Sequence, residues 1–176
     1  MKLRCDLNVN GGSRRLLIVQ GPSEPEAHLA LKLAAFLLFW DKEPIIDAST
    51  KTPALAQYEF LPDVLCLDAA GDISTWVECD SVTMNKLTKL TRRIPKGNGR
   101  IVVLKTSERD AERLRHDMAE QLDRPERVEV LAWPGSSFKD WAAAVAEKTE
   151  VYGDAAEASL NVVLNQTPFA VDFVRY

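Results

Sequence analysis

Two carboxylates lie fifteen residues apart, one on each side of a predicted β-hairpin turn. Asp63 comes just before an apolar run that ends at Leu67, and Glu78 lies near the end of the run that follows Gly71. A glycine between two such runs is typical of a tight turn that needs a positive φ angle. With a loop of two or four residues, Asp63 lies opposite Glu78, and their Cβ atoms are about 5 Å apart.

Like charges at that distance destabilise a sheet unless a cation lies between them. Leu65 and Trp76 would share this face of the hairpin and partly desolvate the two acids. The hairpin therefore predicts a divalent metal ion or a lysine ammonium between Asp63 and Glu78. A three-residue loop would instead put the two carboxylates on opposite faces of the sheet, because it shifts one strand by one residue.

Hydrolysis of a phosphodiester is the chemistry that best suits such a pair of acids. A divalent cation neutralises charge on the phosphate and lowers the pKa of an attacking water. Mg²⁺ takes oxygen ligands and needs only one or two carboxylates, since it keeps several of its waters. The alternative is structural: Asp63 caps the start of a strand, and Glu78 lies at a solvated strand end beside Lys86 or Lys89.

The charge of the chain is unevenly distributed. The net charge of −4 does not indicate a nucleic-acid-binding protein, but residues 81–107 contain seven basic side chains and no acidic one. A basic surface beside two carboxylates would suit DNA or RNA as a phosphodiester partner. A solvated helix and loop would have the same composition, so both interpretations stay open. The seven residues are Lys86, Lys89, Arg92, Arg93, Lys96, Arg100 and Lys105.

The cysteines and histidines do not have the spacing of a metal or redox motif. Cys5, Cys66 and Cys79 include no C-x-x-C pair, and we expect them to be reduced thiols of a cytoplasmic protein. His28 and His116 lie far apart on predicted helices, which argues against a zinc site or a Ser-His-Asp triad.

The composition is that of an ordinary globular chain. With 176 residues, 46% of them apolar and 27% charged, the chain can form one domain, residues 1–176, with a core that needs no disulfides. Residues 1–10 predict a strand rather than a signal peptide. The most apolar run, Leu29 to Trp40, is too short to span a membrane and contains Lys32.

The elements that must position the two acids follow from the apolar pattern. Alternation predicts terminal hairpins, one over residues 1–10 and 15–20 and one over 160–164 and 169–173. Ser23 and Glu26 have the spacing of a capping box, which predicts a buried helix from there to about Trp40. The other expected elements are a strand at 44–47, the central hairpin, helices at 83–94, 107–122 and 136–148, and strands at 100–105 and 126–132. This order predicts an α/β fold, a mixed central β-sheet flanked by helices, with β-hairpins at both chain ends.

Pro62-Asp63 followed by Glu78-Cys79-Asp80 resembles the Pro-Asp…(Asp/Glu)-x-Lys signature of the restriction-endonuclease-like PD-(D/E)XK nuclease superfamily. A more specific resemblance is to the YaeQ family of bacterial proteins, which is assigned to that superfamily. The resemblance covers roughly residues 21–133, so the chain looks like a shortened or divergent member. The matching pieces are Gly21-Pro22-Ser23-Glu24 before an apolar helix, Trp76-Val77-Glu78, the basic helix with Lys86 and Lys89, and the strand that holds Trp133.

This resemblance implies a restriction-endonuclease-like three-layer sandwich with a Mg²⁺ site. Glu78 and Asp63 match the carboxylates on two neighbouring strands, and we expect them to hold the metal. Glu24 matches the acidic residue at the start of the buried helix, which assigns it to the active site. Its alternative role is stabilisation of the helix N-terminus.

The chain departs from the signature at Asp80, where the superfamily has a lysine. Asp80 would be an additional metal ligand on the same face as Glu78, and Lys86 or Lys89 of the next helix would take the lysine's catalytic role. The expected function is a Mg²⁺-dependent, nuclease-like phosphodiesterase that acts on DNA or RNA in the cytoplasm. The alternative is a catalytically silent protein of the same fold that binds a nucleic acid or a protein.

Overall fold

Eleven strands and four α-helices form the fold, seen here in a computed structural model that describes residues 1–176. In chain order they are β1 (Lys2–Val9), β2 (Gly12–Val19), α1 (Glu26–Leu38), β3 (Ile45–Ile46), β4 (Val64–Leu67), β5 (Ile73–Cys79), α2 (Met84–Arg93), β6 (Arg100–Lys105), α3 (Glu108–Gln121), β7 (Val128–Ala132), α4 (Phe138–Ala144), β8 (Lys148–Ala156), β9 (Ser159–Leu164), β10 (Thr167–Asp172) and β11 (Val174–Arg175).

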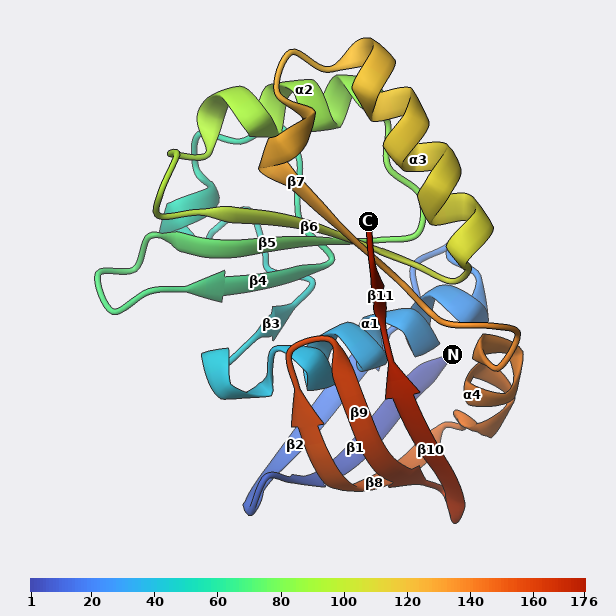
Figure 1. Cartoon of the computed structure of the whole chain (residues 1–176). Coiled ribbons are helices and arrows are strands. Elements are labelled where there is room, and N and C mark those ends of the chain that lie inside the picture. Colours follow the sequence, from blue (N-terminus) through green and yellow to red (C-terminus); the bar gives the residue numbers. More distant parts are fainter.

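The strands form two mixed sheets. The six-stranded sheet has the order β11-β7-β6-β5-β4-β3, with parallel pairs in its centre and antiparallel pairs at both edges. The five-stranded sheet has the order β10-β9-β8-β1-β2, and its one parallel pair joins β1 to β8. The last strands, β10 and β11, follow one another directly and connect the two sheets (Figure 1).

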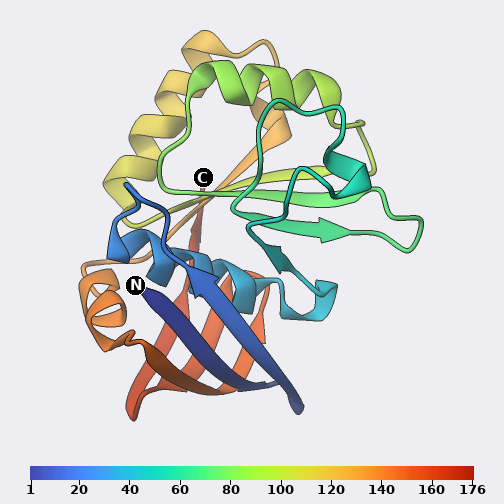
Figure 2. The ribbon, with the colours of Figure 1, turned by 180° about the vertical axis from the view of Figure 1, so that it is seen from behind.

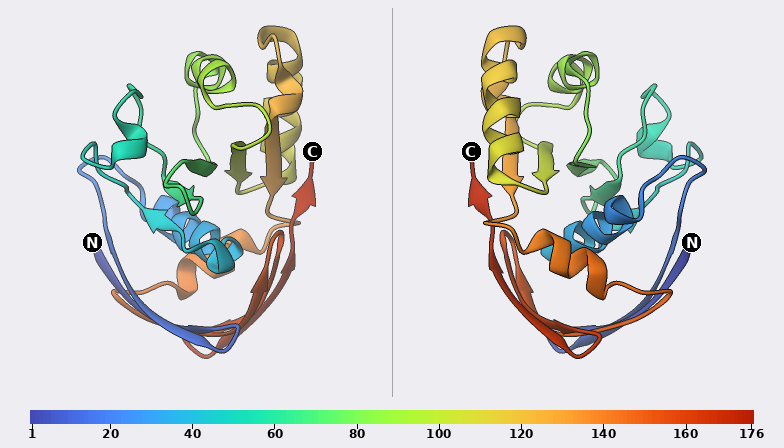
Figure 3. Two further views of the ribbon diagram at one scale, coloured as in Figure 1. Left: turned by 90° about the vertical axis from the view of Figure 1, so that its left-hand side faces the viewer. Right: turned by 90° about the vertical axis from the view of Figure 1, so that its right-hand side faces the viewer.

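Helix α1 lies between the two sheets, and α2 and α3 cover the other face of the six-stranded sheet (Figures 1 and 2). The five-stranded sheet curves around α1, as the side views show (Figure 3). Each face of the six-stranded sheet therefore has its own apolar core, one shared with α1 and one with α2 and α3. Helix α1 is apolar on nearly every side because it packs between two sheets, and the one charged side chain it buries is Lys32. None of the helices is both long and apolar enough to span a membrane.

The expected mixed central sheet flanked by helices is present, and so are the hairpins at both chain ends, but these hairpins belong to a second sheet that the sequence did not predict. The expected helix at 136–148 is too long, since α4 ends at Ala144 and residues 148–156 form β8. The alternating burial of Thr149, Val151 and Ala155 is that of a strand with one buried face. β8 pairs with β1 and with β9, so the two terminal hairpins become parts of one sheet.

The start of α1 also differs from the prediction. Its N-cap is Pro25, and no side chain caps the helix, so the Ser23–Glu26 capping box does not form. The Glu24 carboxylate instead accepts a hydrogen bond from the Gly21 backbone N–H at 2.8 Å, which closes the turn before the helix. At α2 a side-chain cap does form, because Thr83 Oγ1 accepts a hydrogen bond from the Lys86 backbone N–H.

The register of the central hairpin is the one that the sequence predicts. Val64 pairs with Val77 and Leu65 with Trp76, and the ladder becomes irregular only after Cys66, near the turn. This register puts Asp63 opposite Glu78, one residue beyond Val64 and Val77, the last pair of β4 and β5 at this end. The turn itself has Gly71 at φ +83°, as expected for a tight turn.

Candidate active site

Three acidic residues form a row across one end of β3, β4 and β5. Ile46 pairs with Val64, and Val64 pairs with Val77, so the next residue on each strand end is Asp47, Asp63 or Glu78. The Asp47 backbone N–H donates to the Asp63 carbonyl oxygen at 3.1 Å, which fixes the two chain segments side by side. The carboxyl-terminal end of β5 therefore lies beside two further acids.

Glu78 is the most buried acid of the row, with 3% of its surface exposed. Its Oε1 atom accepts a hydrogen bond from Trp76 Nε1 at 2.6 Å and lies 2.6 Å from the Lys86 ammonium. Burial raises the pKa of Glu78 above its ordinary value, and the attraction of Lys86 only partly opposes this effect. Both contacts use Oε1, which leaves Oε2 available for another ligand or a proton.

Lys86 reaches Glu78 from the first turn of α2. Its ammonium also donates to the Leu61 carbonyl oxygen at 3.1 Å and lies 5.6 Å and 5.9 Å from the ring centroids of Phe60 and Trp76. Lys89 lies one turn further on and pairs instead with Glu59, at 2.9 Å. Of the two lysines that the sequence left open, the structure brings only Lys86 to Glu78.

Asp63 faces α1 rather than α2. Its Oδ2 atom accepts a hydrogen bond from the Cys79 backbone N–H at 2.7 Å, and its Oδ1 atom lies 3.1 Å from His28 Nε2. Burial opposes ionisation of Asp63, but the hydrogen bonds from His28 and Cys79 outweigh it and lower the pKa of the carboxyl. The same hydrogen bond with Asp63 raises the pKa of His28.

Lys32 lies at the other end of the acid row and is almost fully buried, with 4% of its surface exposed. Its ammonium is 2.6 Å from Glu24 Oε1, 2.6 Å from Asp47 Oδ1 and 3.8 Å from Asp63 Oδ1. Burial opposes the charge of Lys32, but the hydrogen bonds to Asp47 and Glu24 raise its pKa. We call Lys32 and these three acids, Glu24, Asp47 and Asp63, the Lys32 cluster.

Asp63 and Glu78 share no cation, which corrects the expectation of an amine between them. Asp63 pairs with His28 and Lys32 of α1, whereas Glu78 pairs with Lys86 of α2. Asp63 precedes the first residue of β4, so the alternation of the strand does not fix its side chain, and the Cys79 N–H turns it toward α1. The acids are neighbours in register, but they are held from opposite faces of the sheet.

Asp80 pairs with Lys105 of β6, whereas Glu78 pairs with Lys86 of α2. The strand ends at Cys79, and Asp80 adopts a left-handed backbone with φ +60°. Its carboxylate lies 3.3 Å from the ammonium of Lys105, which also donates to the Asp80 carbonyl oxygen. The regular strand geometry of β5 therefore ends one residue before Asp80.

The basic segment, residues 81–107, is largely neutralised within the fold. Six of its seven cations form ion pairs with acids that lie outside the segment, and Lys96 forms none. The acid partners are Glu59, Glu78, Asp80, Asp123, Glu129 and Glu157. These counter-charges reduce the positive field that this segment would otherwise present.

Sequence reasoning missed three residues of the row and its surroundings: His28, Lys32 and Asp47. A signal was present, because His28 and Lys32 are four residues apart and are the only polar residues between 27 and 38, and Glu24 lies four residues before His28. That spacing places polar side chains on one face of a helix. A polar stripe on a helix that packs between two sheets marks where the helix meets charged groups, here Asp63 and Asp47.

The acid row can bind Mg²⁺ only if the ion takes few ligands from the protein and keeps most of its water ligands. No three Asp, Glu, His or Cys side chains are arranged to ligate one metal ion. Mg²⁺ binds oxygen atoms and is often held by one or two carboxylates, with water in its other positions. Glu78 Oε2 is available for such a contact, and Asp63 is the neighbouring carboxylate in register.

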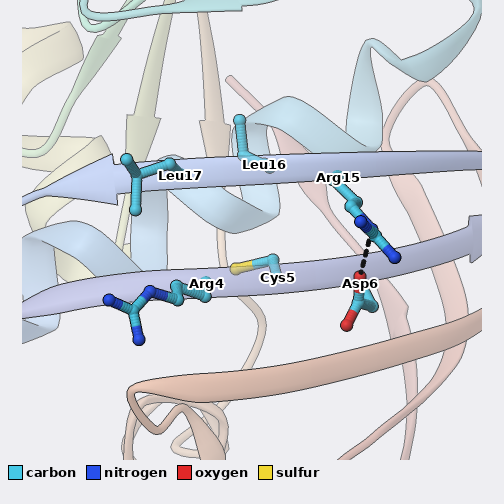
Figure 4. Close-up of a pocket in the computed structure, with 6 residues that line it drawn as sticks. All are labelled: Arg4, Cys5, Asp6, Arg15, Leu16 and Leu17. Atoms are coloured by element: carbon cyan, nitrogen blue, oxygen red, sulfur yellow. Dashed lines mark ion pairs between the residues drawn. The ribbon is translucent and has the colours of Figure 1, made fainter.

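A separate depression lies along β1 and β2 in the five-stranded sheet (Figure 4). Arg15 and Asp6 form an ion pair across it, with Nε 3.3 Å from Oδ1. It belongs to the sheet on the far side of α1 from β5, so it adds nothing to the acid row. Its lining residues are Arg4, Cys5, Asp6, Arg15, Leu16 and Leu17.

The fold is that of an α/β protein in which helix α1 lies between two mixed sheets. His28 and Lys32 of this helix contact the acids at the ends of β3 and β4. The chain belongs to the YaeQ family: the family described as YaeQ protein matches residues 8–172. Among curated proteins, no relative matches the chain.

Two solved structures of YaeQ proteins are similar to the chain. The YaeQ protein from Xanthomonas axonopodis pv. citri has 17% sequence identity and a TM-score of 0.73, and the match covers 99% of this chain and 96% of that one. The YaeQ protein from Pseudomonas syringae has 15% identity and a TM-score of 0.68, with 99% and 93% covered. At these identities the likeness shows the shared fold.

The same matches correct two of the expectations drawn from the sequence. The chain spans nearly the full length of both solved structures, so it is not a shortened form of either. The family match also extends from residue 8 to residue 172, well beyond the segment 21–133 on which the resemblance was based. The low identity agrees with a divergent sequence.

Proposed function

We propose that this YaeQ-family protein is a Mg²⁺-dependent, nuclease-like phosphodiesterase that acts on nucleic acid, with a site centred on Glu78. The observation that carries the proposal is the Glu78–Lys86 pair, with 2.6 Å between Oε1 and Nζ, at the strand end beside Asp63. The proposal includes membership of the restriction-endonuclease-like superfamily and a cytoplasmic location, for which the three unpaired, buried cysteines are the support.

Each residue of the proposed site has a separate task. Glu78 would hold Mg²⁺ through Oε2, and the bound metal would supply charge neutralisation and a more acidic water. Asp63 would join it as a second ligand only if it left His28 and the Cys79 N–H, which hold it toward α1. Lys86 would orient a phosphate oxygen or stabilise the negative charge that develops on it. Trp76 donates its indole N–H to Glu78 and holds that carboxylate in one orientation.

The remaining predicted residues take lesser parts in this proposal. Lys86, rather than Lys89, carries the lysine role, because Lys89 pairs with Glu59. Glu24, in the turn before α1, supports the site through its contact with Lys32. Asp80 would act as a metal ligand only if it left Lys105, so we do not give it that role.

Calorimetric titration with Mg²⁺ and Mn²⁺ tests the metal site. We expect wild-type protein to bind a divalent ion and Glu78→Ala to lose that binding. The matched control is Glu59→Ala, which removes an exposed acid that pairs with Lys89 and should leave metal binding unchanged. No binding by wild-type protein would overturn the proposal.

Cleavage assays on single- and double-stranded DNA and RNA test the chemistry. We expect Lys86→Met to reduce turnover by at least about 100-fold, the range found when one charge-stabilising donor is removed. Lys89→Met changes the same residue type one turn away and should reduce turnover little. Equal losses in both variants would show that Lys86 has no special role.

The second candidate function is a catalytically silent protein that uses the same fold to bind a nucleic acid or a protein. The observation that favours it is that every acid of the row already pairs with a cation of the chain: Asp47 with Lys32, Asp63 with His28, and Glu78 with Lys86. Nucleic-acid binding without metal binding or cleavage would support this candidate over the first.

A further inference from the structure

A cavity of about 360 Å³ lies at the end of the six-stranded sheet where β5 begins. Three segments meet there: the loop before β4, the turn between β4 and β5, and the loop between α2 and β6 (Figures 1 and 2). They contribute Tyr58, Ile73 and Pro95, respectively, to the lining, and we call the cavity the Tyr58 pocket. Its volume is at the low end of the range for small-ligand sites, about 300–1,000 Å³, so it suits one small molecule or one unit of a polymer.

The Tyr58 pocket lies on the same face of the six-stranded sheet as Glu78. Ile73 and Trp76 of β5 both belong to the core that α2 and α3 cover, and Glu78 pairs with Lys86 of α2 on that face. The Tyr58 ring packs against Trp76, with 5.2 Å between the ring centroids, and Trp76 in turn donates to Glu78. A rise of about 3.3 Å per strand residue puts Glu78 about 17 Å from Ile73. A few nucleotides of a single strand can cover this distance.

The lining has the chemistry of a site for a planar, uncharged ring with hydrogen-bonding edges. Tyr58 supplies an aromatic surface, which its contact with Trp76 holds in place. The Asp72 carboxylate can accept hydrogen bonds, the Arg93 guanidinium can donate them, and the Asn98 amide can do both. Because Asp72 and Arg93 carry opposite charges, the lining favours neither an anion nor a cation. A nucleobase has the shape and the hydrogen-bonding groups that such a lining fits.

The polar groups of the Tyr58 pocket are largely available to a ligand. Among the lining side chains, only Arg93 forms hydrogen bonds within the chain, to the Gln57 carbonyl oxygen at 3.0 Å and to the Glu59 carboxylate at 3.2 Å. These contacts hold the guanidinium in position and use its two terminal nitrogens, so its Nε–H stays available. Burial raises the pKa of the Tyr58 hydroxyl, which is therefore a hydrogen-bond donor at neutral pH.

A base can enter a pocket of this kind only when it is unpaired and unstacked. In a duplex the base would first have to leave its partner and its stack, which costs free energy. In a single strand the base is free to turn outward, and aromatic side chains bind such bases by stacking with little regard to sequence. The Tyr58 pocket therefore favours a single strand over a duplex.

We infer that the Tyr58 pocket binds one base of a single-stranded nucleic acid, a few nucleotides away from the phosphodiester at Glu78. The inference rests on the proposed function for the choice of nucleic acid as the ligand, and it names single strands as the substrate class. Tyr58 and Arg93 contact the base in this assignment, and they take no part in the chemistry at Glu78.

Binding of fluorescently labelled single-stranded DNA and RNA, measured by anisotropy without a divalent metal ion, tests the inference. We expect Tyr58→Leu to weaken binding about tenfold, because it removes the stacking contact. Its matched control is Tyr152→Leu, which changes an exposed tyrosine of β8 and should leave binding unchanged. Arg93→Met should also weaken binding. Arg92→Met removes the same charge from the same turn of α2 and should have less effect, since Arg92 pairs with Asp123 away from the pocket.

An abasic single strand of the same length separates recognition of a base from attraction to the backbone. This strand keeps its phosphates but has no bases, so wild-type protein should bind it more weakly than the normal strand. Tyr58→Leu should not weaken its binding further. Equal binding of normal and abasic strands by wild-type protein would overturn the inference, and so would equal binding of the normal strand by wild-type protein and Tyr58→Leu.

Asn98→Ala covers the case in which Tyr58→Leu folds poorly, because Asn98 is an exposed loop residue. It should weaken binding of the normal single strand several-fold. The matched control is Asn161→Ala on β9, which is also exposed but lies in the other sheet. If Asn98→Ala and Arg93→Met both bind the strand as tightly as wild-type protein does, the inference is overturned.

Cleavage assays separate a failure of this inference from a failure of the proposed function. If single strands are cut, but Tyr58→Leu and Arg93→Met change neither binding nor KM, the inference fails and the proposed function stands. If no strand is cut with Mg²⁺ or Mn²⁺, but single-strand binding depends on Tyr58 and Arg93, the pocket assignment stands and the hydrolytic function fails.

Discussion

The two ends of the acid row contain the same kind of contact but differ in their electrostatic state. At one end Lys32 lies 2.6 Å from two acids, and at the other Lys86 lies 2.6 Å from Glu78 alone. The pKa of Glu24 is lowered, because the Gly21 N–H and Lys32 outweigh the effect of burial. The pKa of Glu78 is raised, because its burial outweighs Lys86.

The difference shows that a lysine beside a buried acid does not always lower the pKa of that acid. Glu24 has a backbone donor in addition to its lysine, whereas Glu78 has the indole of Trp76 and is more deeply buried. The balance of burial against donors decides the protonation state. The Lys32 cluster is therefore a stable structural unit, whereas Glu78 can still gain from a further cation.

The largest expected effect comes from removing the cation of the Lys32 cluster. Lys32→Met leaves Glu24 and Asp47 without their shared partner and should lower the free energy of unfolding by about 3 kcal/mol, because it leaves buried charge uncompensated. This value lies at the low end of the range, since 44% of the Asp47 side chain is exposed. Denaturant unfolding measures it. A loss under about 1 kcal/mol would mean that the cluster does little for stability.

The next effect is a dependence of stability on pH that comes from Glu78. Its pKa is raised in the folded state, so the folded chain binds its proton more tightly than the unfolded chain. Stability should therefore fall as pH rises from the ordinary pKa of 4.5 through the higher pKa of the folded state. The fall amounts to about 1.4 kcal/mol for each pH unit that separates the folded pKa from the unfolded one.

The variant Glu78→Gln has no titratable carboxyl group at this position, so its stability should fall less than that of wild-type protein over the same pH range. Denaturant unfolding at a series of pH values checks the slope. Glu120→Gln, on the exposed face of α3, should keep the wild-type slope. Identical slopes for wild-type protein and Glu78→Gln would contradict a raised pKa at Glu78.

A smaller effect is expected from the cation at the other end of the row. Lys86→Met should lower stability by only about 1 kcal/mol, because Glu78 can take a proton when its lysine is gone. Lys89→Met should change it by less than about 0.5 kcal/mol, since that lysine is more exposed. Denaturant unfolding of both compares them with Lys32→Met. A loss from Lys86→Met as large as that from Lys32→Met would remove the distinction between the two ends.

The smallest expected effect concerns His28, whose pKa is raised by its hydrogen bond with Asp63. A histidine with a raised folded pKa stabilises the fold fully below its ordinary pKa of 6.5, and this stability is lost as pH rises through the folded pKa. His28→Ala should remove this change, worth about 1 kcal/mol or less. Denaturant unfolding on both sides of pH 6.5 measures it. His116→Ala, on the exposed face of α3, is the control that should retain the change.

Much of the fold follows from local sequence signals. The parts that could not be predicted are those whose strand pairing has no clear local signal. The register of β4 and β5 was predictable because Gly71 limits the turn. The strand at 148–156 was not, because its local turn to β9, at Glu157 and Ala158, contains no glycine, and its other partner, β1, lies more than 140 residues earlier. The second sheet therefore escaped prediction although both terminal hairpins were found.

The candidate site was predictable for its acids but not for their partners. The sequence placed Asp63 and Glu78 next to one another in register, and the structure agrees. It could not say that Asp63 turns toward α1, because the cause is a single backbone donor, Cys79 N–H. It could not give the partner of Asp80 either, since the ion pair with Lys105 joins the residue after β5 to a residue 25 positions later in the sequence. Side-chain direction at strand ends depends on such individual contacts.

The most direct test of the account is a crystal structure of the wild-type protein with bound Mn²⁺, located by anomalous scattering. The account predicts one ion, with Glu78 among its ligands, and a Lys32 ammonium still between Glu24 and Asp47. An ion bound in the Lys32 cluster with the ammonium displaced, or no ion at Glu78 at saturating Mn²⁺, would contradict it.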